Sequence, residues 1–329
     1  MSNESIKCLV VGGGRIALSH IPHLIDHISV DVVGIVEPNF LLRFVLGRLF
    51  KVKVYRSLDS TRHIDFDATF ILTPPMTHFS LAKQFIERGK HVFVEKPMTL
   101  DALNSAELLR LARDYKVQFF CGYVYRHHPL FKEVKRIVSE QVFGSPTTCE
   151  ISMRGNVVTS NSPVTWRSFG KGSGCLFDYG CHVIDLSIFL FGEPESVTCL
   201  SKDELYQPGV IDRFSAKLDH STYCDVQSSI ICDWSDEHVR KAGIAIEIKT
   251  QDHCIRSDGQ TITVSGDTCV SYSIKELDTD VAFYLRGEEF QNQIEEFFLS
   301  VVNGKADYSN AEDAVSVDET LSKIYEQVL

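Results

Sequence analysis

The sequence predicts an α/β protein in which a doubly wound parallel sheet is followed by an α+β domain with a large open, mostly antiparallel sheet. Three observations support this. Short apolar runs alternate with helical segments through the first 124 residues. A glycine-rich turn follows the first run, and from residue 125 apolar residues alternate with Ser, Thr or Asp. We therefore expect two domains, residues 1–124 and 125–329.

In the first domain, apolar runs without alternation predict strands that are buried on both faces. These runs occupy residues 7–11, 31–36, 68–72, 91–94 and 118–121. Helical segments separate them, ending near residue 26 and covering 40–50, 79–88 and 100–115. Because crossovers between parallel strands are right-handed, this order predicts a doubly wound sheet.

In the second domain, strands with period two predict a sheet with two different faces. The alternating runs are 196–201, 212–218, 223–232, 243–250, 261–264 and 269–274. Helices are expected at 131–139, 175–191, 288–302 and 311–328. We expect helices to cover one face of this sheet, while the other meets water or another subunit.

The composition is that of a globular protein, with 44% hydrophobic and 23% charged residues. Its 33 Lys and Arg against 44 Asp and Glu give a net charge of −11. Because nucleic acid and anionic membranes require positive charge, we expect neither as a partner. The ten cysteines form no C-x-x-C pair, so no metal site is expected. With no export signal at the N-terminus, the expected location is cytoplasmic.

The turn at residues 11–17 fits the pattern G-x-G-x-x-A. In this pattern Gly12 permits the tight turn, Gly14 lets a pyrophosphate approach the backbone, and Ala17 keeps the helix close to the sheet. The helix would begin at Arg15 and Ile16, offering N–H groups and a positive dipole end to phosphates. Alone, the motif also fits an ordinary glycine-rich loop.

An acid at the end of the second strand strengthens this reading. Glu37 lies 20 residues after Ala17, where a carboxylate can bind the adenosine ribose hydroxyls. The alternative is a solvated carboxylate at a strand end. Because an acid there repels a 2′-phosphate, the sequence favours NAD(H) over NADP(H) in a Rossmann fold. We interpret Arg43 and Arg48, which follow on the next helix, as surface charges.

Two later motifs follow strands at the carboxyl edge of the sheet, where such folds bind ligands. Thr73 and Pro74 open a loop after the third predicted strand, and His78 follows either as a ligand contact or as a helix-start residue. Glu95 and Lys96 end the next strand, so the lysine is expected to point into the cofactor cleft. The whole set of Thr73, Pro74, His78 and Glu95 is predicted to contact the cofactor.

The segment 172–185 carries a carboxylate and an imidazole on one expected helix. Asp178 and His182 are four residues apart and would share a face, which Asp185 extends. One apolar helix would then present a polar active face. The alternative is that the aspartate and the histidine only cap the helix or pair with each other.

Taken together, these segments resemble the Gfo/Idh/MocA oxidoreductases, the group of glucose–fructose oxidoreductase and inositol dehydrogenase. The resemblance covers nearly the whole chain, and the combination of Glu-Lys-Pro with D-x-G-x-H is its most specific part. It rests on residues 12–17, 73–74, 95–97, 122–126, 166–167 and 178–185. One departure is Ser173, which stands in the glycine triplet of the family. The resemblance implies that Lys96, Asp178 and His182 form the catalytic centre.

The activity implied is NAD(H)-dependent interconversion of a secondary alcohol and a ketone on a sugar, cyclitol or sugar nucleotide. His182 is the expected general acid/base, Lys96 would stabilise the reacting oxygen, and Asp178 would orient the substrate. Further expected substrate contacts are Tyr123, Arg126, Trp166 and Arg167, although each arginine could instead form a salt bridge. A catalytically silent NAD-binding sensor, and an enzyme that uses bound NAD in a redox-neutral reaction, remain alternatives. The second sheet is expected to form a homodimer or homotetramer.

Overall fold

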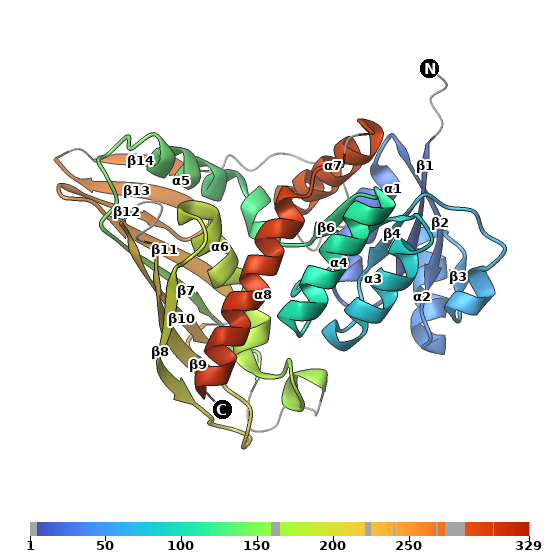
Figure 1. The fold of residues 1–329 in the computed structure, drawn as a ribbon, viewed down its shortest axis with the longest axis horizontal. Helices are drawn as coiled ribbons and strands as arrows, with labels where there is room; N and C mark the ends of the chain where they lie inside the picture. Colours follow the sequence, from blue (N-terminus) through green and yellow to red (C-terminus); the bar gives the residue numbers. More distant parts are fainter. Residues whose placement is uncertain are drawn as a thin grey trace. The chain divides into compact units, whose positions relative to one another are not determined.

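The computed structural model describes residues 5–158, 165–220, 225–239, 241–267, 269–273, 287–304 and 306–328. These residues form two compact units, each of which is described by itself (Figure 1). The first lies within Met1–Thr99, Leu103–Val124 and Asp278–Glu312. The second lies within Leu100–Ala102, Tyr125–Leu277 and Asp313–Leu329.

The first unit contains a six-stranded parallel sheet of order β3-β2-β1-β4-β5-β6, which confirms the predicted doubly wound fold. Its strands are β1 (Ile6–Val11), β2 (Val30–Val36), β3 (Val54–Tyr55), β4 (Ala68–Ile71), β5 (His91–Val94) and β6 (Phe119–Cys121). Successive connections leave β1 in opposite directions along the sheet. The strand order therefore reverses between β1 and β4, the point at which such sheets bind ligands.

Helices and short turns connect these strands. They are α1 (Ala17–Asp26), α2 (Phe40–Phe50), α3 (His78–Ile86), α4 (Ala102–Tyr115), η1 (Leu58–Thr61) and η2 (Pro75–Thr77). The start of α2 has a clear local cause, because the Asn39 side chain accepts a hydrogen bond from the Leu42 N–H at 3.1 Å. The predicted helix at residues 40–50 is confirmed.

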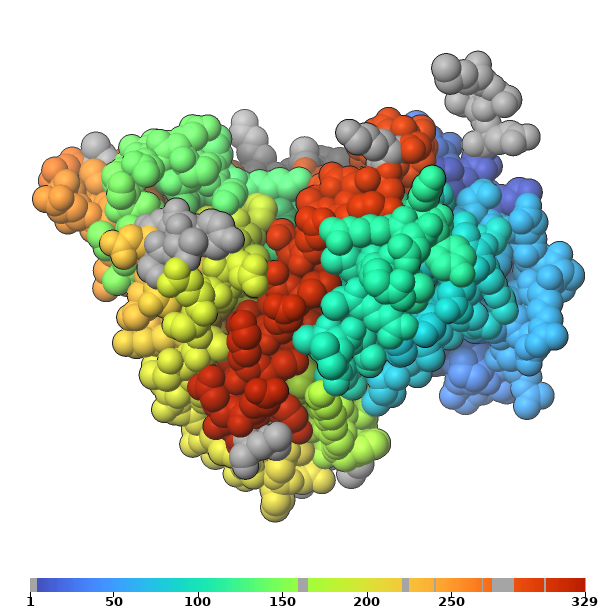
Figure 2. All heavy atoms as spheres, viewed as in Figure 1, coloured from blue at the N-terminus to red at the C-terminus, as the bar shows by residue number. Residues whose placement is uncertain are grey.

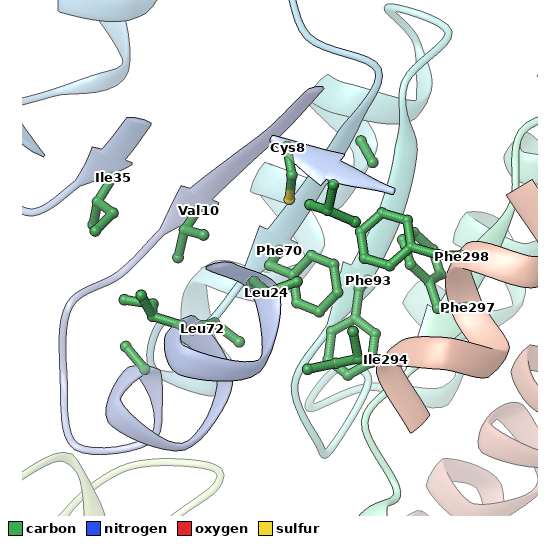
Figure 3. Packing of buried hydrophobic residues seen from close by; sticks show 14 of the residues in the cluster. Cys8, Val10, Leu24, Ile35, Phe70, Leu72, Phe93, Ile294, Phe297 and Phe298 are labelled. Carbon is green, nitrogen blue, oxygen red and sulfur yellow. The ribbon is translucent and has the colours of Figure 1, made fainter. Parts of the chain in front are cut away.

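A helix far along the sequence completes the first unit. α7 (Glu288–Val302) places Phe297 against Phe70 and Phe93, with ring centroids 5.4 and 5.9 Å apart (Figure 3). Ile294 and Phe298 join the same buried cluster. Edge-to-face aromatic contacts of this kind add to the free energy gained by burial.

The boundary predicted at residue 124 differs from this arrangement, because α7 had been assigned to the second domain. The physical reason is that the apolar face of α7 could pack on the apolar face of either sheet, and the sequence pattern does not distinguish between them. Only the three-dimensional structure shows that this face packs on the first sheet.

The second unit is built on an eight-stranded sheet of order β14-β13-β12-β11-β7-β10-β9-β8. Its strands are β7 (Thr148–Arg154), β8 (Ser196–Asp203), β9 (Arg213–Asp219), β10 (Gln227–Asp233), β11 (Gly243–Lys249), β12 (His253–Ser257), β13 (Thr261–Gly266) and β14 (Val270–Ser273). Only β7 and β10 pair in parallel, so the mostly antiparallel sheet is confirmed. Burial alternates along β9, β10 and β11, as period two predicts. Tyr223 and Ile274, in two predicted runs, lie outside the described residues.

The other elements of the second unit are η3 (Val124–His127), α5 (Pro129–Ser139), η4 (Trp166–Ser168), η5 (Leu176–Gly180), α6 (Cys181–Phe191) and α8 (Ser309–Val328). The first residue of η3 and the first residues of α8 belong to the first unit. The predicted helix at 175–191 is confirmed as a continuous helical stretch, within which η5 is a π-helical turn that precedes α6. Gly180 fits closely here, since a Cβ would lie 2.8 Å from the Phe214 ring. Such π-turns are often found at functional sites. Among the described helices, none has the length and apolar character to cross a bilayer.

Candidate active site

The glycine turn of the first unit has the geometry that a bound pyrophosphate requires. Gly12 has φ +106°, and a Cβ at this position would lie 2.5 Å from the Leu72 carbonyl oxygen. At Gly14, by contrast, a Cβ would meet nothing within 4 Å, so there is space beside the backbone. Ala17, the first residue of α1, is fully buried, and Arg15, two residues before it, is exposed. The turn therefore holds the helix close to the sheet and leaves its N-terminus open to an anion.

Glu37 directly follows β2 and is hydrogen-bonded to this turn. Its Oε2 accepts a hydrogen bond from the Gly13 N–H at 2.9 Å, and its Oε1 accepts one from the Asn39 N–H at 2.7 Å. A carboxylate accepts more hydrogen bonds than these two, so ribose hydroxyls can still be bound. The open side of Gly14, the exposed start of α1 and the Glu37 carboxylate together fit the phosphates and ribose of a dinucleotide.

Arg43 is hydrogen-bonded to the main chain at Glu37, whereas the sequence predicts a surface charge. Its Nη1 donates hydrogen bonds to the main-chain oxygens of Glu37 and Pro38, at 3.1 and 2.6 Å. The guanidinium thus fixes the loop that carries Glu37. It is a structural contact within the binding loop rather than an isolated surface charge.

The loop after β4 contains two of the predicted cofactor contacts, and a third anchors it. Thr73 and the exposed Pro74 follow the strand directly. His78, the first residue of α3, is fully buried, with Nε2 2.8 Å from the Thr73 oxygen and Nδ1 2.9 Å from the Pro97 oxygen. Burial lowers the pKa of His78, and the two carbonyl groups oppose this shift. His78 therefore joins two loops and has no exposed surface for a ligand.

Lys96 lies two residues after the end of β5, and two contacts hold the side chain of its neighbour Glu95. Glu95 is buried, with Oε1 2.7 Å from Nε2 of His20 on α1, while its Oε2 accepts the Lys96 N–H at 3.1 Å. The His20 ring also contacts Phe93 and Phe290 edge-on. Glu95 thus shapes the main chain at Lys96, although it was predicted to contact the cofactor. No local pattern indicates a role for His20, because it lies 75 residues from Glu95 in the sequence.

These features of the first unit meet at one edge of its sheet. β1, β4 and β5 are adjacent and parallel, so their carboxyl ends lie side by side. The glycine turn, the Thr73–Pro74 loop and Lys96 follow these three ends in that order. The chain therefore brings Lys96 to the same edge of the sheet as the glycine turn.

In the second unit, the π-turn carries Asp178. This carboxylate is nearly buried, and its Oδ2 accepts a hydrogen bond from Nε of Arg167 at 2.9 Å. The Arg167 guanidinium also lies over the Trp166 ring, 4.3 Å from its centroid. Both residues belong to η4, so this short turn is joined to the π-turn by a charged hydrogen bond.

His182 lies in the first turn of α6, next to an aromatic ring. The Tyr125 ring meets the imidazole edge-on, with centroids 4.9 Å apart. His182 as a whole residue is buried, at 8% exposure, so its ring is held by its surroundings. Tyr125 belongs to the quoted 122–126 segment but had no predicted role.

Arg126 does not present its charge to solvent. Its Nε donates to Oδ1 of Asp185 at 2.6 Å, and its Nη1 pairs with Asp313 on α8. Burial raises the pKa of Asp185 to about 7, against the opposing effect of Arg126. Of the two roles that the sequence left open for Arg126, the salt bridge is the one that the structure shows. Asp185 on α6 is a partner in this salt bridge. Tyr123, which follows β6 in the first unit, is buried.

Comparison with known proteins places the chain in a family. Residues 6–123 match the profile of an oxidoreductase family with an NAD-binding Rossmann fold. Residues 131–256 match the Gfo/Idh/MocA C-terminal domain. The chain belongs to the Gfo/Idh/MocA family.

Curated relatives of this Gfo/Idh/MocA chain include inositol 2-dehydrogenase of Rhizobium meliloti (strain 1021). It is 30% identical over 197 residues, which are 59% of this chain and 58% of the relative. The chain spans about half the length of the first relatives it matches, 54% and 53% for oxidoreductases of Synechocystis and Bacillus subtilis.

Solved structures resemble this Gfo/Idh/MocA chain over almost its entire length. Levoglucosan dehydrogenase in complex with NADH and levoglucosan has a TM-score of 0.87 at 19% identity, covering 98% of this chain and 97% of the other. The 3-ketoreductase KijD10 from Actinomadura kijaniata, in complex with TDP-benzene and NADP, has a TM-score of 0.82 at 18% identity and the same coverage of 98% and 97%. These likenesses concern the fold.

Proposed function

We propose that this chain is an NAD(H)-dependent oxidoreductase that interconverts a secondary alcohol and a ketone on a sugar, cyclitol or sugar nucleotide. The observation that carries the proposal is the position of Lys96, at the sheet edge that also holds the glycine turn and Glu37. A charged hydrogen-bond donor at this edge suits a reaction in which an alkoxide develops beside a dinucleotide. The inositol 2-dehydrogenase relative supports a polyol-like substrate.

The proposed catalytic residues are Lys96, Asp178 and His182, the set that the family resemblance implies. His182 takes the hydroxyl proton as the alcohol is oxidised and returns it in the reverse direction, since imidazole titrates near neutral pH. Lys96 donates a hydrogen bond to the reacting oxygen, and Asp178 orients the substrate. The bound nicotinamide would supply the hydride acceptor or donor. Among the remaining predicted substrate contacts, Trp166 offers a ring, whereas Arg167 orients Asp178.

We propose NAD(H) rather than NADP(H) as the coenzyme. The Glu37 carboxylate is held beside Gly13, where it repels a 2′-phosphate and accepts hydrogen bonds from ribose hydroxyls. Arg43 is bound to the main-chain oxygens of the same loop, which supports a structural role for its charge. The carboxylate therefore dominates the choice of coenzyme.

The Glu37→Ala variant is expected to bind NADH about 10- to 100-fold more weakly, the equivalent of about 1.5–3 kcal/mol for charged hydrogen bonds. NADPH should lose less affinity, because the repelling charge is removed as well. Fluorescence titration with both coenzymes measures this. Glu37→Gln is the matched control, since it keeps an acceptor for the Gly13 N–H and separates loop damage from loss of charge. Unchanged NADH affinity in Glu37→Ala would remove the ribose role.

Turnover on a panel of polyols, sugars and sugar nucleotides, followed by NADH absorbance, tests the proposed reaction. We expect at least one substrate to reduce NAD, and we expect the Lys96→Ala control to reduce it about 10²- to 10³-fold more slowly. A catalytically silent sensor would bind NADH without turnover of any panel member. A redox-neutral enzyme would retain its coenzyme through purification and convert substrate without net NADH.

We further propose that the polar face of the second sheet joins copies of the chain into a homodimer or homotetramer. Outward-facing positions along β7 and β11 include Thr148, Glu150, Ala245 and Lys249, all of them exposed. A wide face of this kind, covered by small and charged side chains, suits a self-complementary contact.

A further inference from the structure

The helix α2 exposes most of its apolar residues to solvent. Within α2, only Leu46 is buried, at 2% exposure. The exposed apolar side chains are Phe40 (69%), Leu41 (70%), Leu42 (39%), Phe44 (59%), Val45 (53%) and Leu49 (48%). A surface helix normally turns such residues towards the core and polar residues outward. The atoms of α2 form part of the blue surface in Figure 2.

Most of these exposed residues gather on one side of the helix. Successive side chains of an α-helix are about 100° apart, so Leu46 and the partly buried Phe50 point into the unit together. The opposite half contains Phe40, Leu41, Phe44, Val45 and Leu49, and Arg48 is its only charged member. The outward side of α2 is thus a continuous apolar strip with one cation near its middle.

The charge around this strip is opposite in sign to that of the chain. Residues 38–58 contain no Asp or Glu, although the whole chain carries 44 acids and a net charge of −11. The same stretch contains five cations, which are Arg43, Arg48, Lys51, Lys53 and Arg56. All of them except Arg43 are exposed.

We propose that α2 docks the protein on an anionic membrane surface. The apolar strip lies among the lipid headgroups, and Arg48, Lys51, Lys53 and Arg56 pair with lipid phosphates. Exposed aromatic and leucine side chains with basic neighbours are what helices that lie in a bilayer interface present. This inference does not depend on the proposed reaction, and it departs from the expectation, based on the net charge of the whole chain, that an anionic membrane is not a partner.

The charge pattern favours a lipid surface over a second copy of the chain. Two α2 helices packed together would bring like-charged arginines and lysines side by side, which costs free energy. A bilayer supplies the opposite charge and adapts to a convex helix. The acidic remainder of the chain opposes binding only weakly, because charges farther away than about 10 Å are largely screened at 0.1 M salt.

Flotation of the full chain with vesicles tests this proposal. Vesicles of phosphatidylcholine alone are compared with vesicles in which phosphatidylglycerol makes up about a third of the lipid. The wild type should float with the anionic vesicles and bind the neutral ones several-fold less. Raising the salt concentration should weaken binding to the anionic vesicles.

A triple variant, Leu41→Gln, Phe44→Gln and Val45→Gln, should lose about tenfold or more of its vesicle binding, since inserted apolar area drives interfacial binding. Arg48→Glu should abolish the preference for anionic lipid. The matched control is Leu103→Gln on α4, at a position that is 82% exposed, and it should bind like the wild type. Melting temperature and NADH affinity should be unchanged in all three variants, because each altered side chain is exposed.

Three results would overturn the proposal. One is a wild type that stays unbound with both kinds of vesicle. Another is a triple variant that floats as the wild type does. The third is chromatography in which the wild type forms an oligomer that the triple variant loses, which would assign α2 to a contact between copies. Retention on a polyglutamate column without flotation would instead assign the strip to an acidic protein partner.

Discussion

The His182→Ala variant should lose about 10²- to 10⁴-fold in kcat, the usual contribution of a positioned general acid/base. His182 is 8% exposed, and its imidazole is held against the Tyr125 ring, so its removal takes away the proton carrier without exposing a large core. The pH profile of kcat/KM should also lose one of its inflections. Steady-state kinetics across pH with the substrate found by screening measures both effects.

Two comparisons keep this result interpretable. NADH affinity should stay close to wild type, because the glycine turn and Glu37 belong to the first unit, whereas His182 belongs to the second. His238→Ala, an exposed histidine of the second unit, should leave kcat unchanged. Full activity of His182→Ala on the true substrate would show that another group moves the proton.

The Lys96→Ala variant should lose about 10²- to 10³-fold in kcat, as expected when one donor to a developing oxyanion is removed. Its place at the end of β5 depends on Glu95 and His20, which stay in position, so the loop should remain folded. Stopped-flow measurement of NADH formation, together with the melting temperature, measures the effect. Lys96→Arg should recover part of the rate, because it keeps a charged donor.

Lys90→Ala provides the matched control, since Lys90 carries the same charge in the same unit and pairs with Asp65 at 3.7 Å. It should leave kcat unchanged. If Lys96→Ala instead weakened NADH binding by the whole factor lost in kcat/KM, the lysine would serve the coenzyme rather than the reacting oxygen. That outcome would remove Lys96 from the proposed chemistry.

The sheets were predictable to the extent that their strands had a clear period. Strands such as β1 and β5 contain short runs of consecutive buried apolar residues, and burial alternates along β9 and β11. β7 was missed although Thr148–Arg154 alternates in the same way, so a signal was present. β3 has only two residues, too few for any period to show.

The site was harder to predict because its decisive contacts join residues far apart in sequence. A single sequence shows that Arg126 and Arg167 are cations, but their pairing with Asp185 and Asp178 depends on how the second unit folds. The close fit of Gly180, in the π-turn before α6, against Phe214 likewise depends on how the second unit folds. The motif residues were visible, whereas the contacts that fix their orientation were not.

The position of α7 has a consequence for how the protein is made. The sheet of the first unit is complete once β6 ends at Cys121, but Phe70 and Phe93 are covered only when Phe297 arrives. A nascent chain leaving the ribosome would therefore expose apolar side chains of this sheet while residues 122–287 are being translated, and that interval is when a chaperone would bind them.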